Sequence, residues 1–290
     1  MDSILLLILV LLYTFQSFFC KLYTTACKVE KTATPVFNAL FGGVIGLVTL
    51  GIYGFRFQPS AVTWIFGLVN AVLLFVYNSA LIGASKRGSY AFLNICMLFG
   101  GILVPMFVSL IQWGDTFSLM QILAILLMLA AFVVINCKGI SFQGSQGMYY
   151  LFCVLLFLSN GAFGAVMDGQ QRMLAGKERG EMIVISYVGT AVLSLLYIAV
   201  LEKKEFVPSF KVGTKALLFG LGSGAVAVAA VNLMMYLLTK IPSTILYTID
   251  NGGVMVASAL FAAIFLKEKI EKQQALGYVL ALVSIVMLSL

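Results

Sequence analysis

Apolar residues gather along the chain into ten long runs, which short polar or glycine- and proline-containing breaks separate. A segment of ~20 mostly apolar residues is long enough to cross the hydrocarbon core of a bilayer as an α-helix. The pattern therefore predicts an all-α integral membrane protein with ten transmembrane helices and short loops. The expected spans are about 3–23, 34–54, 61–84, 89–112, 117–137, 147–169, 181–201, 214–238, 243–266 and 273–290.

The ninth run carries the most polar stretch expected at membrane depth. Asp250 and Asn251 lie in its first half, and Gly252 and Gly253 follow them. An ionised carboxylate in hydrocarbon costs several kcal/mol unless it faces protein or water, and glycines let another backbone approach closely. Two interpretations are open: a functional site, or a structural aspartate tied to a backbone group or to a Lys of a neighbouring helix.

Composition agrees with this pattern and removes several classes of function. Hydrophobic residues make up 62% of the chain and charged residues 10%, whereas soluble globular domains are ~45–50% apolar and ~25% charged. The chain has no His, and its five cysteines form no CxxC pair, so nothing predicts a metal site, a disulfide framework or a cofactor. The net charge of +7 comes from basic residues in the short breaks, which is typical of membrane topology and not of a nucleic-acid interface.

The later part of the chain repeats polar landmarks of the earlier part. The aligned pairs are Asn78 with Asn232, Gln121 with Gln274, and Gln16 with Asn160, at offsets of 154, 153 and 144 residues. Each match is weak in an apolar sequence, but their common order in both parts indicates a duplication. The glycine-rich stretch 139–147 lies between the parts, so we expect one five-helix repeat at 1–140 and another at 141–290. An odd number of spans per repeat gives the two opposite orientations, as in the inverted repeats of many secondary transporters.

Three features together carry a resemblance to a known family. They are the two five-span halves, the small-residue junctions 84–89 (ASKRGS) and 239–243 (TKIPS), and the turn 266–270 (LKEKI) with Gln274 and Gly277 after it. These features resemble the EamA-like branch of the drug/metabolite transporter superfamily over nearly the whole chain. The resemblance implies a ten-helix transporter of small organic solutes. The first half departs from the pattern at 114–116, where it has Gly-Asp-Thr in place of Lys-Glu-Lys.

Basic residues are unevenly shared between the two sets of loops. The loops after the odd-numbered spans hold 13 Lys and Arg residues, and the other side holds five. By the positive-inside rule, the first set is cytoplasmic and both termini lie outside. Members of the resembled superfamily are often drawn with both termini inside, so the charge count and the resemblance give opposite orientations.

Polar side chains follow helical spacing on the first, fourth, sixth and ninth runs. Such stripes on apolar helices must point away from lipid, so we expect them to converge on one central pocket. The candidate substrate-binding residues are Tyr13, Gln16, Tyr90, Asn94, Asn160, Tyr247, Asp250 and Asn251. Hydrogen bonding between helices explains Gln16, Asn94 and Asn160 equally well when each is taken singly. Asp168 is a weaker candidate, because the sixth run is expected to end near it.

Four residues late in the third and eighth runs are candidates for gating or lining the pocket. They are Tyr77, Asn78, Asn232 and Tyr236. Anchoring at the membrane interface is the alternative role for the two tyrosines.

Secondary transport is the function that these features favour. The chain has no His and no ATP-binding motif, and its acids other than Asp250 and Asp168 lie in loops or at span edges, so an enzyme or a pump driven by ATP is a poor fit. We expect export of a small metabolite or drug by alternating access in a bacterial cytoplasmic membrane, with Asp250 coupling transport to a proton or pairing with a substrate amine. The expected partners are the substrate, the lipid bilayer and a coupling proton, in a monomer or homodimer. The alternatives are a channel or a membrane scaffold without transport, and an intramembrane enzyme.

Overall fold

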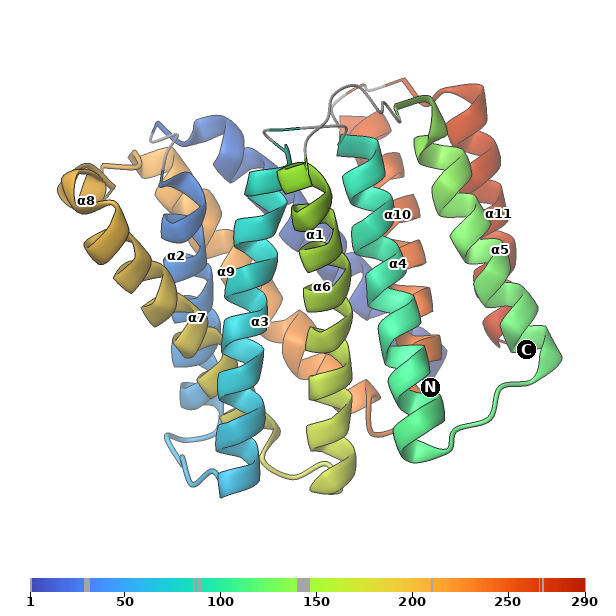
Figure 1. Cartoon of the computed structure of the whole chain (residues 1–290), viewed down its shortest axis with the longest axis horizontal. Coiled ribbons are helices and arrows are strands. Elements are labelled where there is room, and N and C mark those ends of the chain that lie inside the picture. The colour runs from blue at the N-terminus through green and yellow to red at the C-terminus, as the bar shows by residue number, and fades with distance from the viewer. Residues whose placement is uncertain are drawn as a thin grey trace. The chain divides into compact units, whose positions relative to one another are not determined.

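A computed structural model shows the chain as a set of long helices, with no strand among the residues that it describes (Figure 1). It describes every residue except 1, 29–31, 86, 88, 89, 140–146, 210, 266, 268 and 290, and it leaves out the side chains of 2, 82, 85, 90, 91, 139, 208, 262 and 289. Most of the predicted joint between the halves, and Leu266 and Glu268 of the 266–270 turn, therefore lie outside the described residues.

The described residues form ten helices of 18 to 27 residues. They are α1 (Asp2–Ala26), α2 (Ala33–Ile52), α3 (Ala61–Ser85), α4 (Tyr90–Val108), α5 (Leu119–Asn136), α6 (Gly147–Met173), α7 (Arg179–Leu201), α9 (Thr214–Leu237), α10 (Ser243–Phe265) and α11 (Lys272–Ser289). Shorter elements are a π-helical turn at Ser109–Trp113, 3₁₀ turns at Cys137–Gly139 and Lys203–Glu205, and α8 (Phe206–Ser209).

Nine of the described helices are long and apolar enough to cross a membrane, and the other long one, α11, is apolar over the shorter segment Lys272–Leu288. Their side chains include many exposed large hydrophobic residues, such as Leu47, Ile65 and Leu126. A helix in lipid satisfies its backbone hydrogen bonds internally, and apolar side chains on its outer face are compatible with contact to lipid. The chain is an integral multi-pass membrane protein, and the helices lie where the apolar runs predict them, with ends shifted by a few residues.

Local sequence accounts for several helix ends. Ser118 and Gln121 form a capping box at the start of α5, in which each side chain accepts a hydrogen bond from the other residue's backbone N–H. Helix α4 contains Pro105 and continues into the π-helical turn, which ends at Gly114 in the left-handed conformation (φ 67°). Pro105 removes one backbone donor from α4.

The helices cluster into two compact units. The first unit comprises residues 1–11, 79–165 and 240–290, and the second comprises 12–78 and 166–239. Each unit thus takes helices from both predicted sequence halves. The repeats at 1–140 and 141–290 concern the sequence and not the packing, so they remain a prediction.

In the first unit, α5 packs along α11 (Figure 1). Small buried residues, among them Ala124, Ala131 and Ala281, allow the two helices to lie close together. The hydroxyl of Ser284 donates to the carbonyl of Ala124 at 2.6 Å and so joins α11 to α5.

In the second unit, α2 packs against both α7 and α9 (Figure 1). Gly42 and Gly46 face α7 so closely that a Cβ at either position would collide with the carbonyl of Tyr187 or the side chain of Val188. The Thr190 hydroxyl links α7 to α3 by donating to the carbonyl of Ala71 at 3.2 Å.

Candidate functional site

Helix α10 carries three of the candidate binding residues, Tyr247, Asp250 and Asn251. The side-chain amide of Asn251 donates to the carbonyl of Tyr247, one turn earlier, at 2.8 Å. Because a backbone carbonyl only accepts hydrogen bonds, this contact orients the Asn251 amide with its nitrogen toward the helix and its Oδ1 away from that bond.

The two glycines after Asn251 lie where α10 meets other helices of the first unit. A Cβ at Gly252 would collide with the end of the Met128 side chain of α5. At Gly253 it would lie 2.7 Å from a methyl carbon of Val10, in the part of α1 that belongs to this unit. The close approach that the sequence predicts for this glycine pair is therefore present, and it fixes α10 on both sides.

Tyr247 connects α10 to α6. Its hydroxyl donates to the carbonyl of Gly164 at 3.1 Å, and its ring lies flush against the same glycine, where a Cβ would be 3.0 Å from ring carbons. Gly164 thus provides both the acceptor and the space for the aromatic ring. The sequence pattern identifies Tyr247 but gives no sign of this partner, since the two residues are 83 positions apart.

Asn160 connects α6 to α4. Its amide nitrogen donates to the carbonyl of Met97 at 2.8 Å. Close packing of the two helices makes this possible, because Gly100 and Gly161 each lie against the backbone of the opposite helix.

Gly101 of α4 lies between two asparagine side chains. A Cβ at Gly101 would be 2.7 Å from the amide nitrogen of Asn160 and 3.2 Å from that of Asn251. The two amides therefore share one small region bounded by α4, α6 and α10. We call Tyr247, Asp250, Asn251 and Asn160 the polar cluster of the first unit.

The polar cluster offers acceptors, and each of its two asparagines also keeps one of the two N–H groups of its amide. Asn160, Asn251 and Tyr247 donate to the carbonyls of Met97, Tyr247 and Gly164. Within the described residues, no group donates to Oδ1 of either asparagine. A ligand that carries N–H or O–H donors matches these oxygens.

Asp250 precedes Asn251 on α10 and carries a further acceptor, its carboxylate. Its Oδ1 is shielded from the surface and has no hydrogen-bond partner in the part of the chain that the structure describes. A buried polar atom without a partner is uncommon and costs free energy, so each such atom requires an explanation. The structural alternative for Asp250 needs a backbone donor or a Lys at this oxygen, and the described residues supply neither.

The remaining candidates of the first unit have other surroundings. Asn94 donates to the side-chain oxygen of Asn136 at 3.4 Å, and Asn136 in turn donates to the carbonyl of Phe132 at 2.8 Å. This pair of hydrogen bonds ties α4 to α5, which is the contact that the interhelical interpretation of Asn94 expects, and the binding role of Asn94 stays a prediction. Tyr90 is the first residue of α4, and its side chain lies outside the described residues.

The second unit holds the candidates of α1 and all four gating candidates. Tyr13, Gln16, Tyr77 and Asn78 are half-buried there. The backbone carbonyl of Gln16 accepts a hydrogen bond from the hydroxyl of Ser223 at 3.2 Å, which leaves its side chain available for other contacts.

Two of the gating candidates have structural partners within the second unit. Asn232 donates to the hydroxyl of Thr49 at 3.2 Å and to the carbonyl of Val228 at 2.8 Å, and so joins α9 to α2. The guanidinium of Arg179 lies over the ring of Tyr236, 5.6 Å from its centre. These contacts stabilise the unit, and a gating role would have to break them.

Sequence reasoning missed a hydrogen-bonded chain at one end of the second unit. Gln170 donates to the hydroxyl of Thr63 at 3.0 Å, and the Glu178 carboxylate accepts from the backbone N–H and the hydroxyl of Ser60, both at 2.9 Å. Hydrogen bonds from Thr63 first, and then from Ser60, lower the pKa of Glu178 from its ordinary value. The sequence signal for this contact was Glu178, an acidic residue in a short loop. An acidic residue in such a loop is normally taken to be exposed to solvent, so the contact was not expected.

The sequence predicts that the sixth span ends near Asp168, and the structure differs from this prediction. Helix α6 continues to Met173, so Asp168 is buried inside the helix and forms an ion pair with Arg172 at 3.0 Å. The i, i+4 spacing brings the two charges together on one face. No group of three or more metal-ligating side chains occurs among the described residues.

Comparison with known proteins gives one family and one fold. Residues 148–290 match the model of the EamA-like transporter family. A solved structure described only as "Crystal structure of protein" superposes with a TM-score of 0.74 over 99% of this chain and 98% of that one, at 17% sequence identity. At this identity the likeness shows a shared fold and nothing about activity. No curated protein sequence matches the chain.

Proposed function

We propose that the whole chain is a secondary transporter of the drug/metabolite transporter superfamily, because residues 148–290 match the model of the EamA-like transporter family. It carries a small organic metabolite or drug out of the cell across a bacterial cytoplasmic membrane. Two inverted five-helix repeats alternate access to a site near the middle of the bilayer. An ion gradient or the gradient of the substrate supplies the energy, since the sequence has no nucleotide-binding motif.

The observation that carries the proposal is the buried, unpartnered oxygen of Asp250 within the described residues. Ionisable groups inside membrane spans are costly and commonly serve ion or substrate pathways. Asp250 alternates between a proton and the ammonium or other donor group of the substrate, which gives a proton-coupled cycle.

The acceptor character of the polar cluster supports a substrate that carries donors. Asn251 is the neighbour of Asp250 in the sequence of α10, and Asn160 of α6 approaches Gly101 together with Asn251; each of the two amide nitrogens donates to a carbonyl, which leaves each amide oxygen free to accept. An amine or a zwitterion with an ammonium group satisfies these oxygens. A purely anionic solute would leave them unsatisfied and would meet the charge of Asp250.

Counterflow in proteoliposomes tests the transport proposal. The purified chain, loaded with a candidate amine inside vesicles, should accelerate uptake of the labelled compound from outside, with saturation as its concentration rises. Ohmic currents without saturation would indicate a channel. Ligands for this assay come from a thermal-shift screen of metabolites and cationic drugs, because a compound that binds the native state raises its apparent stability.

A further inference from the structure

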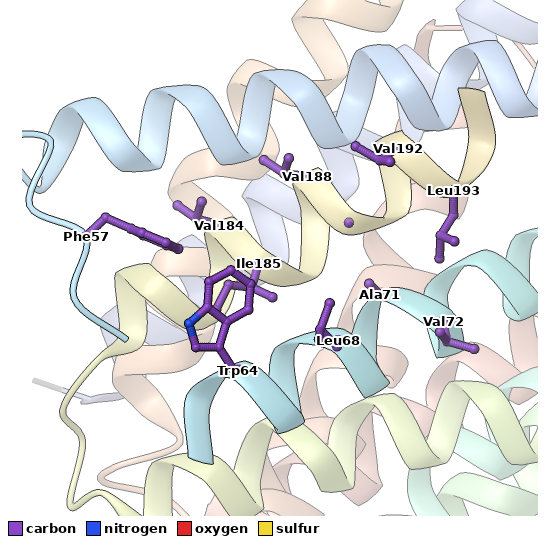
Figure 2. Close-up of a pocket in the computed structure, with 11 residues that line it drawn as sticks. Phe57, Trp64, Leu68, Ala71, Val72, Val184, Ile185, Val188, Val192 and Leu193 are labelled. Carbon is purple, nitrogen blue, oxygen red and sulfur yellow. The ribbon is translucent and has the colours of Figure 1, made fainter. Parts of the chain in front are cut away.

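A groove lined by apolar side chains lies on the second unit between α3 and α7 (Figure 2). Its volume is about 360 Å³. Ala71 and Gly189 lie at its base, where a Cβ on Gly189 would be 2.7 Å from that of Ala71. The two helices therefore nearly touch along this line, and the larger side chains of Leu68 and Val192 border the groove.

The groove opens onto the outer, apolar side of its two helices. Leu68, Val72 and Val192 line it and are each about half exposed, at 51%, 50% and 47%. Sites for polar solutes combine an apolar lining with a few polar groups that fix the ligand's orientation. Apart from the indole nitrogen of Trp64, the side chains that line this groove carry only carbon and hydrogen, which suits a flexible hydrocarbon chain.

One end of the groove has the features of a membrane interface. Figure 2 shows Phe57 and Trp64 together at this end, and their rings pack edge to face with centroids 5.9 Å apart. Tryptophan and other aromatic residues concentrate at the level of the lipid headgroups. The hydrocarbon part of the groove therefore begins where a headgroup would lie.

The residue beside Phe57 supplies a positive charge at this level. Arg56 is exposed, and no carboxylate pairs with it among the described residues. Glu178, from the neighbouring loop, is held by Ser60. Arg179 lies over the ring of Tyr236. Arg56 thus has no carboxylate partner among the described residues and is the cation adjacent in sequence to the groove residue Phe57, so a phosphate is a suitable partner for it.

We propose that this groove is a binding site for an anionic phospholipid, with one acyl chain between α3 and α7 and the phosphate on Arg56. The site lies within the second unit and uses none of the residues of the polar cluster. It adds a lipid ligand to the transporter, independently of the transported substrate.

Quenching of Trp64 by brominated lipids tests the proposal. The chain has two tryptophans, so Trp113→Phe leaves Trp64 as the only emitter at the groove. The protein is reconstituted in vesicles that contain increasing fractions of brominated phosphatidylglycerol or brominated phosphatidylcholine. We expect half-maximal quenching by the anionic lipid at a mole fraction about fivefold lower, the preference that one basic side chain near the surface gives.

Two variants test the headgroup contact and the acyl-chain contact separately. Arg56→Gln should remove the preference for the anionic lipid, and Val192→Phe should fill the groove and weaken quenching by both lipids. Leu47→Phe, at an exposed position of α2 outside the groove, is the matched control and should change neither. Equal quenching by the two lipids, in proportion to their bulk fractions and unaffected by Arg56→Gln, would overturn the proposal. Quenching that instead falls as protein is concentrated in the vesicles would assign the groove to a second copy of the chain.

Discussion

Gln121 and Gln274 make the same hydrogen bond at equivalent places in the two halves of the chain. Each side-chain oxygen accepts from the backbone N–H three residues earlier, that of Ser118 or Glu271, at 3.0 Å. Both bonds lie at the start of the helix that closes a half, α5 in one case and α11 in the other. The sequence offset of 153 residues thus pairs two side chains that make the same helix-capping hydrogen bond, and the duplication itself stays a prediction.

Loss of either cap should destabilise the protein by a similar amount. We expect Gln121→Ala and Gln274→Ala each to lower the free energy of unfolding by ~0.5–1 kcal/mol, because each leaves a helix-terminal N–H without its acceptor. Thermal melting in detergent measures the difference. Gln58→Ala, in an exposed loop, is the control and should melt like the wild type. A large loss from one variant and none from the other would argue against equivalent roles.

Glu178 should make the stability of the fold depend on pH. Its folded-state pKa lies below the unfolded value, so its ionised form stabilises the fold above the unfolded pKa, and this contribution disappears as the pH falls through the folded pKa. The melting temperature of the wild type should therefore exceed that of Glu178→Gln at pH 7. This gap in melting temperature should close below about pH 4.

A double-mutant cycle identifies the source of that gap. Ser60→Ala removes one hydroxyl donor to the Glu178 carboxylate, so it should narrow the gap at pH 7. In the Glu178→Gln background the same substitution should have a smaller effect. A gap between wild type and Glu178→Gln that stays constant from pH 7 to pH 3 would contradict the assignment.

The positions of the Asn160 and Asn251 side chains should depend on the absence of a side chain at Gly101. Gly101→Ala places a methyl group against both amides, and overpacking of this kind costs ~1–3 kcal/mol or displaces the side chains. We expect reduced transport per folded molecule, measured by counterflow. Gly43→Ala is the matched control, because nothing lies within 4 Å of its Cβ position and alanine is the better helix former. Equal transport by the two variants would remove the asparagine pair from the site.

The 13-to-5 distribution of basic residues predicts a cytoplasmic loop at Lys203 and Lys204. In a variant without native cysteines, Lys204→Cys should resist an impermeant thiol reagent in intact cells and react after the cells are opened. Arg56→Cys belongs to the opposite set of loops and should react at once in intact cells. The reverse labelling pattern would favour the orientation in which the superfamily is often drawn.

The sequence predicted the helices well because the bilayer imposes the same length and apolarity on every span. It predicted side-chain partners poorly, because these depend on which helix faces which. Asn94 fits a binding stripe as well as it fits a bond to Asn136, and only packing decides between them. Gly164 shows the same limit, since its role depends on the ring of Tyr247 far along the chain. Asp168 shows another limit, because α6 continues past the expected end of its span and there pairs Asp168 with Arg172.

Transport by Asp250→Asn in proteoliposomes tests the central claim most directly. The substitution keeps the size of the side chain and removes its charge and its titration. We predict that the variant folds, loses accumulation driven by a pH gradient, and loses the pH dependence of transport. Accumulation at the wild-type level with an unchanged pH profile would contradict the account and would return Asp250 to a structural role.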